Sequence, residues 1–246
     1  MKTLVLKLAG PLQAWGTDSR FAYRHTDPHP SKSGVIGLLA AAQGRRRSDS
    51  IEDLLGLRFG IRRDQPGRVI RDFHTAARPD RSMVQPLTYR YYLSDAVFAA
   101  AVQGNDDLVE GLAKALRQPR FPLYLGRRSC PPASPPFVAV LTRPVSEVLT
   151  STARESGVPW LASPWWQRKQ PVDVHLDIVR DADPGELEHD RVRDVPLSFD
   201  PHHRRFGTRS VVTDVCRLTN DVSRRRVRTS HDPFDMWEKA DAPDAD

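Results

Sequence analysis

Hydrophobic and polar positions follow two different periods in the first half of the chain. Residues Thr3 to Ala9 are mostly apolar and end abruptly at Gly10-Pro11, which is typical of a buried strand. From Gly34 to Ala42 the apolar side chains recur at helical spacing, and Gly44 is a helix stop signal. The pattern therefore predicts a strand followed by a helix that begins after Ser31-Lys32-Ser33.

The same alternation of elements continues along the chain. The predicted elements are a short helical piece from Ile51 to Leu57, strands at Arg58 to Arg63, Ala96 to Val102 and Phe137 to Leu141, and an amphipathic helix from Asp106 to Leu116. This order, β-α-β followed by β-α-β, predicts an α+β fold of the ferredoxin-like, or RRM-like, type. In that plan two helices cover one face of an antiparallel sheet, and the other face is left free.

An inserted arm separates the two halves of this pattern. Residues 64–92 show no core period and carry Pro66-Gly67, Pro79 and Pro86 among Arg, His and Tyr side chains. Such a stretch favours a projecting hairpin or loop, which is a common form of binding element.

The last third of the chain gives a weaker pattern. Val172 to Val179 and Val211 to Leu218 alternate as strands, whereas PWW, DPHHRR and SRRRVR are typical of loops or exposed edges. We expect a ferredoxin-like domain over residues 1–143, with the arm at about 64–92, and a smaller β-rich region over residues 144–246, which ends in an acidic tail.

The charge distribution points to a polyanionic partner. The chain has 37 Lys and Arg against 31 Asp and Glu, and six of the acids lie in residues 232–246 beside a single lysine. The remainder has 36 basic and 25 acidic side chains, and such a surplus attracts nucleic acid because phosphate contacts release counterions. Arginine supplies 31 of the cations, although a GC-rich genome would also favour arginine.

Two cysteines, Cys130 and Cys216, are too few for a disulfide framework and have no zinc-ligand spacing. A reduced cytoplasm is the simplest setting. The amino-terminal apolar run is interrupted by Lys7, so we expect neither a signal peptide nor a membrane segment.

Several motifs, taken together and in order, closely resemble the CasD family of the type I-E CRISPR surveillance complex (Cascade). They cover most of residues 4–143 and are LAGPLQAWG at 8–16, PSKSG at 30–34, GLLAAAQG at 37–44, DFHT at 72–75, RYYLSDA at 90–96 and LYLGRRSC at 123–130. The resemblance implies a subunit that caps the 5′ handle of the guide RNA in antiviral defence. Its implied partners are the guide RNA, the backbone subunit and the large subunit, with target DNA reached only through the complex.

The resemblance and the residue chemistry together give a set of candidate RNA-binding residues. They are Gln13, Trp15, Arg24, Ser31, Lys32, Ser33, Arg62, His74, Arg90, Tyr91, Gly126, Arg127, Arg128 and Ser129.

Each motif in this set also has a purely structural interpretation. Ser31-Lys32-Ser33 at a helix start could converge on a phosphate or could simply cap the helix. Gly126-Arg127-Arg128 would lie against the guide backbone by resemblance, or form a solvated turn. Trp15 could stack on an unpaired base or fill the core beneath its loop. The Arg and Tyr groups at both ends of the arm interleave charge with aromatic rings, as single-stranded RNA binding requires.

Two alternative functions fit parts of the sequence. His25, His29 and His74, with Tyr23 and Lys32, could form a metal-independent ribonuclease, as in relatives from another CRISPR subtype. In the type I-E branch a different subunit cuts the guide, so we expect no enzyme, no catalytic residue and no cofactor. A general RNA chaperone is the second alternative. His202-His203 lacks Cys or carboxylate partners at ligand spacing, so no metal site is expected.

Overall fold

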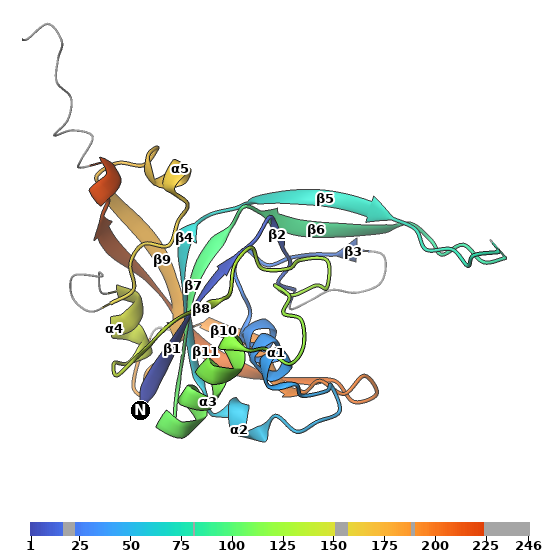
Figure 1. Cartoon of the computed structure of the whole chain (residues 1–246), viewed down its shortest axis with the longest axis horizontal. Helices are drawn as coiled ribbons and strands as arrows, with labels where there is room; N and C mark the ends of the chain where they lie inside the picture. The colour runs from blue at the N-terminus through green and yellow to red at the C-terminus, as the bar shows by residue number, and fades with distance from the viewer. Residues whose placement is uncertain (17–22, 81, 151–156, 188–189, 224–246) are drawn as a thin grey trace, which may run out of the picture.

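In the computed structural model, which describes residues 1–16, 23–80, 82–150, 157–187 and 190–223, the chain forms a mixed α+β fold dominated by antiparallel sheet (Figure 1). The strands are β1 (Lys2–Ala9), β2 (Leu12–Gln13), β3 (Tyr23–Arg24), β4 (Arg58–Gln65), β5 (Arg68–His74), β6 (Thr88–Ser94), β7 (Val97–Gly104), β8 (Phe137–Leu141), β9 (Asp173–Asp181), β10 (Asp190–Ser198) and β11 (Arg205–Thr219). The helices are α1 (Lys32–Gln43), α2 (Glu52–Leu55), α3 (Asp106–Arg117), α4 (Val145–Thr150) and α5 (Pro164–Gln167).

Seven strands form the main sheet in the order β10-β11-β9-β4-β7-β1-β8. Strand β9 pairs with β4, with Ile61 opposite Val179, so backbone pairing crosses the expected boundary at residue 143. The carboxy-terminal strands therefore extend the sheet that the first half of the chain builds.

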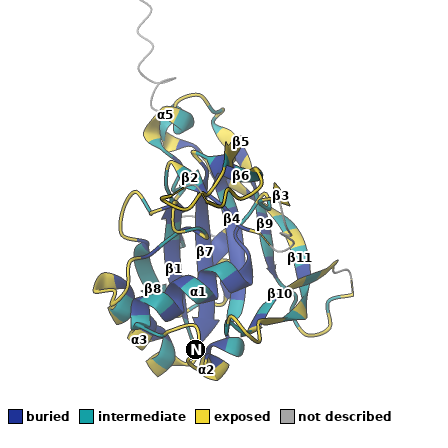
Figure 2. Cartoon of the chain, turned by 90° about the vertical axis from the view of Figure 1, so that its right-hand side faces the viewer, coloured by how far each residue is buried: buried dark blue, intermediate teal, exposed yellow. Residues whose placement is uncertain are grey.

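Both faces of the main sheet are covered. The side chains of β1 alternate, so that Leu4, Leu6 and Leu8 pack in one cluster with α1 and α3, while Val5 belongs to a second cluster with Val148 of α4. The expectation of a free second face is therefore wrong for the centre of this sheet. Figure 2 shows the buried strands behind α1.

Helix α1 has the capping residues that the sequence signals, and α3 has charged residues that suit its ends. Ser31 Oγ accepts a hydrogen bond from the Gly34 amide at 3.2 Å, and Gly44 ends α1 with φ of 80°. Helix α3 carries Asp106 and Asp107 in its first turn and basic residues in its last, which suits the helix dipole.

Three elements of the last third were not expected. Strand β10 forms one edge of the sheet, and its charged side chains and Pro196 hide the alternating pattern of a strand. Helix α4 was not expected, and the PWW stretch forms the short helix α5 instead of a loop. Residues 200–204 form a turn as expected, whereas most of SRRRVR and the acidic tail lie outside the described residues.

The arm is a hairpin that continues β4 and β7 outward. Strands β5 and β6 pair along their whole length, from Arg68 opposite Ser94 to His74 opposite Thr88. They form a second sheet with β2 and β3, which both pair with β6. Figure 1 shows this hairpin projecting far beyond the body.

Candidate nucleic-acid interface

Trp15 and Gln13 lie inside the core beneath the first loop. The Trp15 side chain is 1% exposed, and its Nε1 donates to Gln13 Oε1 at 2.9 Å. Gln13 in turn donates to the carbonyl oxygens of Leu8 and Ala96. A Cβ on Gly34 would come within 2.8 Å of the indole, so α1 packs directly on this ring. In this structure Trp15 offers no free face to a base.

The amino terminus of α1 is already occupied by carboxylates. Lys32 Nζ lies 2.9 Å from Asp181 Oδ2, and the Lys32 amide donates to Asp194 Oδ2 at 2.7 Å. Ser31, Lys32 and Ser33 are all buried. These acids stand where a phosphate was expected, and they satisfy the same donors.

Arg209 completes this buried cluster. Its guanidinium binds Asp194 through two nitrogens, at 2.6 and 3.0 Å, and Asp181 at 2.7 Å. Burial alone would lower the pKa of Arg209, but the two carboxylates outweigh it and raise that pKa. The cluster therefore ties α1 to β9, β10 and β11 as a charged structural joint.

Arg62 is also a buried residue with a structural role. Its side chain is fully buried, and Nε lies 2.6 Å from Asp64 Oδ1. Its terminal nitrogens donate to the carbonyl oxygens of Leu149, Val158 and Pro159. The guanidinium thus holds the backbone of Leu149, Val158 and Pro159 against β4 and has no surface with which to meet RNA.

The Gly126 loop joins the body to the arm. Gly126 has φ of 89°, and a Cβ there would lie 1.7 Å from the Ala14 carbonyl oxygen, so only glycine fits. The next residue, Arg127, donates to the carbonyl oxygens of Tyr91 at 2.9 Å, Arg24 at 2.8 Å and His25 at 3.2 Å. Its guanidinium also lies 4.9 Å from the centre of the Tyr92 ring. Arg127 therefore positions β3 against β6.

Side chains of Arg24 and Arg90 lie next to each other on the face of the arm sheet that Arg127 contacts. They are register partners across β3 and β6, so both point to the face of Tyr92. Arg24 is exposed, and the buried Arg90 Nε has no hydrogen-bond partner in the described part of the chain. Arg128 and Ser129 are exposed in the adjoining loop.

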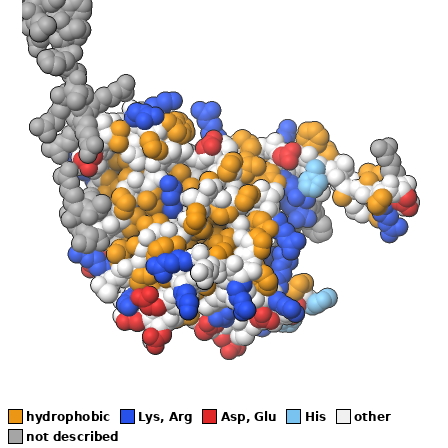
Figure 3. Space-filling view, viewed as in Figure 1, with side chains coloured by type: hydrophobic (Ala, Val, Ile, Leu, Met, Phe, Trp, Pro, Cys, Tyr) orange, Lys and Arg blue, Asp and Glu red, His pale blue; other side chains and the backbone are white. Residues whose placement is uncertain are grey.

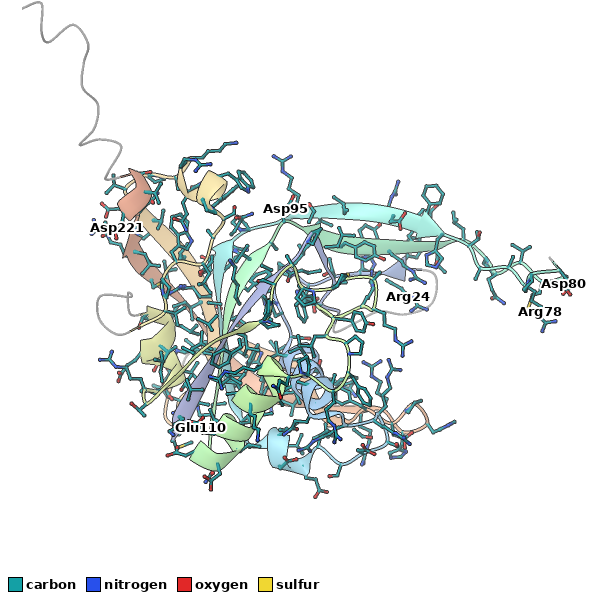
Figure 4. The ribbon with its side chains drawn as sticks, viewed as in Figure 1. Arg24, Arg78, Asp80, Asp95, Glu110 and Asp221 are labelled. Atoms are coloured by element: carbon teal, nitrogen blue, oxygen red, sulfur yellow. The ribbon has the colours of Figure 1, made fainter. Side chains whose placement is uncertain are left out.

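We call Arg24, Arg90, Arg127 and Arg128 the basic face. Figure 4 shows Arg24 below the outer part of the β5–β6 pair, well short of Arg78 and Asp80 at the tip of the arm. Figure 3 shows Lys and Arg side chains following one another down the side of the body beneath the arm. The structure thus gathers part of the expected set into one positive surface.

The opposite face of the same sheet is aromatic. The expected RNA-binding set contains only Tyr91 of it, while Tyr23 and His25 are considered only for a ribonuclease. Tyr23 stacks on Tyr89, and His25 stacks on Tyr91, with ring centres 5.3 and 4.9 Å apart. The signal available in the sequence was the spacing of two between Tyr23 and His25 and between Tyr89 and Tyr91. That signal becomes meaningful only once β3 is known to pair with β6.

Comparisons with known proteins agree with this architecture. Residues 3–212 match the family described as CRISPR-associated protein (Cas_Cas5). The chain belongs to this family. It is 39% identical to the CRISPR system Cascade subunit CasD of Escherichia coli (strain K12) over 155 residues, which are 55% of this chain and 69% of that protein.

Two solved structures resemble the whole fold of this family member. One, titled "CRISPR RNA-guided surveillance complex", contains a chain 33% identical with a TM-score of 0.69, covering 89% of this chain and 92% of that one. The other, "Crystal structure of Cas protein", is 38% identical with a TM-score of 0.66, covering 89% and 96%. The likeness to the CasD family that the motifs indicate is therefore confirmed.

Two residues of the possible ribonuclease, Lys32 and His25, have their side chains engaged in other contacts in this family member. Lys32, the expected charge stabiliser, is paired with Asp181, and His25 stacks on Tyr91. His74 lies at the end of β5, where its carbonyl accepts from Thr88. Within the described residues, no three His, Cys, Asp or Glu side chains are placed to hold a metal. None of the described helices has the length and apolar character needed to cross a membrane.

Proposed function

We propose that this chain is the RNA-binding subunit of a type I-E CRISPR surveillance complex and caps the 5′ handle of the guide RNA in the cytoplasm. The observation that carries the proposal is the likeness to the Cascade subunit CasD. In this chain the part of the arm where β3 pairs with β6, which we call the arm root, presents a positive surface. In this role the subunit anchors the backbone and large subunits and reaches target DNA only through the assembled particle. Its contribution to antiviral defence is binding.

The handle phosphates contact the basic face. Arg24, Arg90 and Arg128 supply charge, and the free Nε of Arg90 is a ready donor for a phosphate oxygen. Gly126 and Arg127 hold β3 and β6 in place, while Ser129 and His74 lie at the borders of this surface. Gln13, Trp15, Ser31, Lys32, Ser33 and Arg62 support the site from inside the fold and do not touch RNA.

The arm reaches the neighbouring backbone subunit. Large apolar side chains are exposed toward its tip, with Val84 at 61%, Met83 at 47% and Leu87 at 40%. A strand pair of this kind exposes apolar surface that a partner protein would bury. Among its described residues the tip is paired through one isolated bridge, between Ala77 and Val84, with few hydrogen bonds, so it can adapt to that partner.

We also infer that the first half of the chain follows the ferredoxin-like plan. Strands β4, β7, β1 and β8 lie side by side in that order, each antiparallel to its neighbours. With α1 between β1 and β4 and α3 between β7 and β8, this order supports the plan.

A salt titration of handle-RNA binding tests the basic face. Removing the charges of Arg24 and Arg90, in the double variant Arg24→Gln/Arg90→Gln, should flatten log K against log[salt] by about 0.7 per lost contact. The control is Lys114→Gln, an exposed cation on α3, which should leave the slope unchanged. An unchanged slope in the double variant would remove the arm root from the RNA site.

A further inference from the structure

Four aromatic rings form a compact array on the face of the arm sheet opposite Arg24 and Arg90. Three pairs among Tyr23, His25, Tyr89 and Tyr91 are near parallel. Tyr23 and Tyr89 are 5.3 Å apart at 16°, His25 and Tyr91 are 4.9 Å apart at 19°, and Tyr23 and His25 are 6.4 Å apart at 12°. The rings thus stand as two stacked pairs, one after the other along β3 and β6.

This array is not part of the hydrophobic core. Tyr23 is 52% exposed, His25 is exposed, and Tyr89 and Tyr91 are half-buried. The next residues along β6, Tyr92 and Leu93, do belong to the core, so the array begins where the core ends. Aromatic surface presented in this way is typical of a binding site.

Positive charge accompanies the rings on the same face. The Arg71 guanidinium lies 5.3 Å from the centre of the Tyr89 ring, and its side chain is exposed. Arg71 is the register partner of Tyr91 across β5 and β6, so the cation and the rings share one surface. A cation beside stacked rings suits a ligand that is both flat and anionic.

We propose that this array stacks unpaired bases of single-stranded RNA. The inference rests on the proposed function and deepens it, because it gives the arm root two chemically different faces. Tyr23 and Arg24 are adjacent in β3, so their side chains point to opposite faces at the edge of the sheet. A strand that crosses this edge places phosphates against Arg24 and Arg90 and bases against Tyr23 and Tyr89.

Base stacking predicts tolerance of sequence, since every base has a flat π surface. It also predicts that the array contributes affinity without adding to the salt dependence, which the basic face supplies. The two faces can therefore be separated by experiment.

The test uses single-stranded handle RNA that carries 2-aminopurine at one position at a time, whose fluorescence falls on stacking. The double variant Tyr23→Leu/Tyr89→Leu removes two flat rings, and Tyr23→Phe/Tyr89→Phe is the matched control that keeps them. We expect the leucine variant to bind roughly 5- to 150-fold more weakly, with an unchanged salt slope and without quenching. The phenylalanine variant should behave as the unaltered protein, and thermal melts report whether each variant is folded.

Photo-crosslinking of 5-bromouridine-substituted RNA to the unaltered protein needs no variant, and we expect adducts on Tyr23, Tyr89 or Tyr91. A folded leucine variant that keeps the RNA affinity and the 2-aminopurine quenching of the unaltered protein would overturn the stacking site. Adducts found only on residues other than Tyr23, Tyr89 and Tyr91 would also overturn it. A leucine variant that binds RNA normally but fails to join the particle would also overturn it, by making the array a protein contact. In each case the salt titration of Arg24 and Arg90 still decides the proposed function by itself.

Discussion

Lys32 Nζ lies 2.9 Å from Asp181 Oδ2, and the two side chains are only 7% and 14% exposed. Asp181 also accepts hydrogen bonds from the Phe59 amide and from Arg209, so one carboxylate joins α1, β4, β9 and β11. A lysine at a helix start, which from the sequence alone could bind a phosphate, here connects the two halves of the sheet.

Replacing this lysine should destabilise the protein. Lys32→Met leaves Asp181 buried with one fewer cation, and breaking a buried pair in this way costs about 3 kcal/mol. Urea unfolding measures the loss, and the exposed Lys114→Met on α3 is the control. Unchanged stability combined with a salt slope flattened by about 0.7 would instead make Lys32 a phosphate contact.

Removing the buried indole of Trp15 should also destabilise the protein. Trp15→Ala is expected to cost about 3–5 kcal/mol of stability, because the ring fills the space between the first loop and Gly34. The control is Trp165→Ala on α5, where the ring is 44% exposed. A normal melting temperature with weakened RNA binding would restore the stacking role to Trp15.

A single methyl group on Gly126 should disturb the arm root. Gly126→Ala places Cβ against the Ala14 carbonyl at a backbone angle that alanine disfavours, so the loop must move and Arg127 must release β3. We expect a lower melting temperature together with weaker handle binding. Gly111→Ala on α3 has open space and should stabilise slightly, by about 0.5–1 kcal/mol. Similar changes in melting temperature for Gly126→Ala and Gly111→Ala would contradict the close approach of Gly126 to the Ala14 carbonyl.

The tip of the arm should be protected only in the particle. In free protein thermolysin, which cuts before apolar residues, is expected to cut at the exposed Met83 and Val84, while the buried Phe59 resists. Limited proteolysis of the free and assembled protein, followed by mass spectrometry, compares the two states. Equal protection of Met83 and Val84 in both states would exclude the arm as the partner contact.

No cleavage of repeat RNA is expected when the protein is incubated with it in EDTA. His74→Ala should likewise leave guide length unchanged in assembled particles, because Lys32 is committed to Asp181 and cannot stabilise developing charge. Metal-independent cutting that disappears in the His74 variant would establish the ribonuclease alternative.

Some elements of this fold could be predicted from apolar periodicity and others could not. The apolar periods of β1 and α1 are local, so their positions could be predicted to within a few residues. Strand β10 could not, because an edge strand keeps charges and proline that break the alternation. The same motifs that identify the family include Trp15 and Lys32, so motif membership alone does not separate surface residues from buried ones.

The sequence by itself determined the order of the main elements in the first half, the positive charge and the family to which the chain belongs, because periodicity, composition and motifs are properties of neighbouring residues. Only the tertiary structure decided which cations remain free for RNA. Lys32 is neutralised by Asp181 and Arg62 by Asp64, whereas Arg24 and Arg90 meet across two strands that are far apart in sequence. Asp72 lies opposite Arg90 across β5 and β6, but among the described residues it forms no ion pair with Arg90. A charge is available only when folding places no carboxylate in direct contact with it, and that depends on partners that the local sequence does not specify.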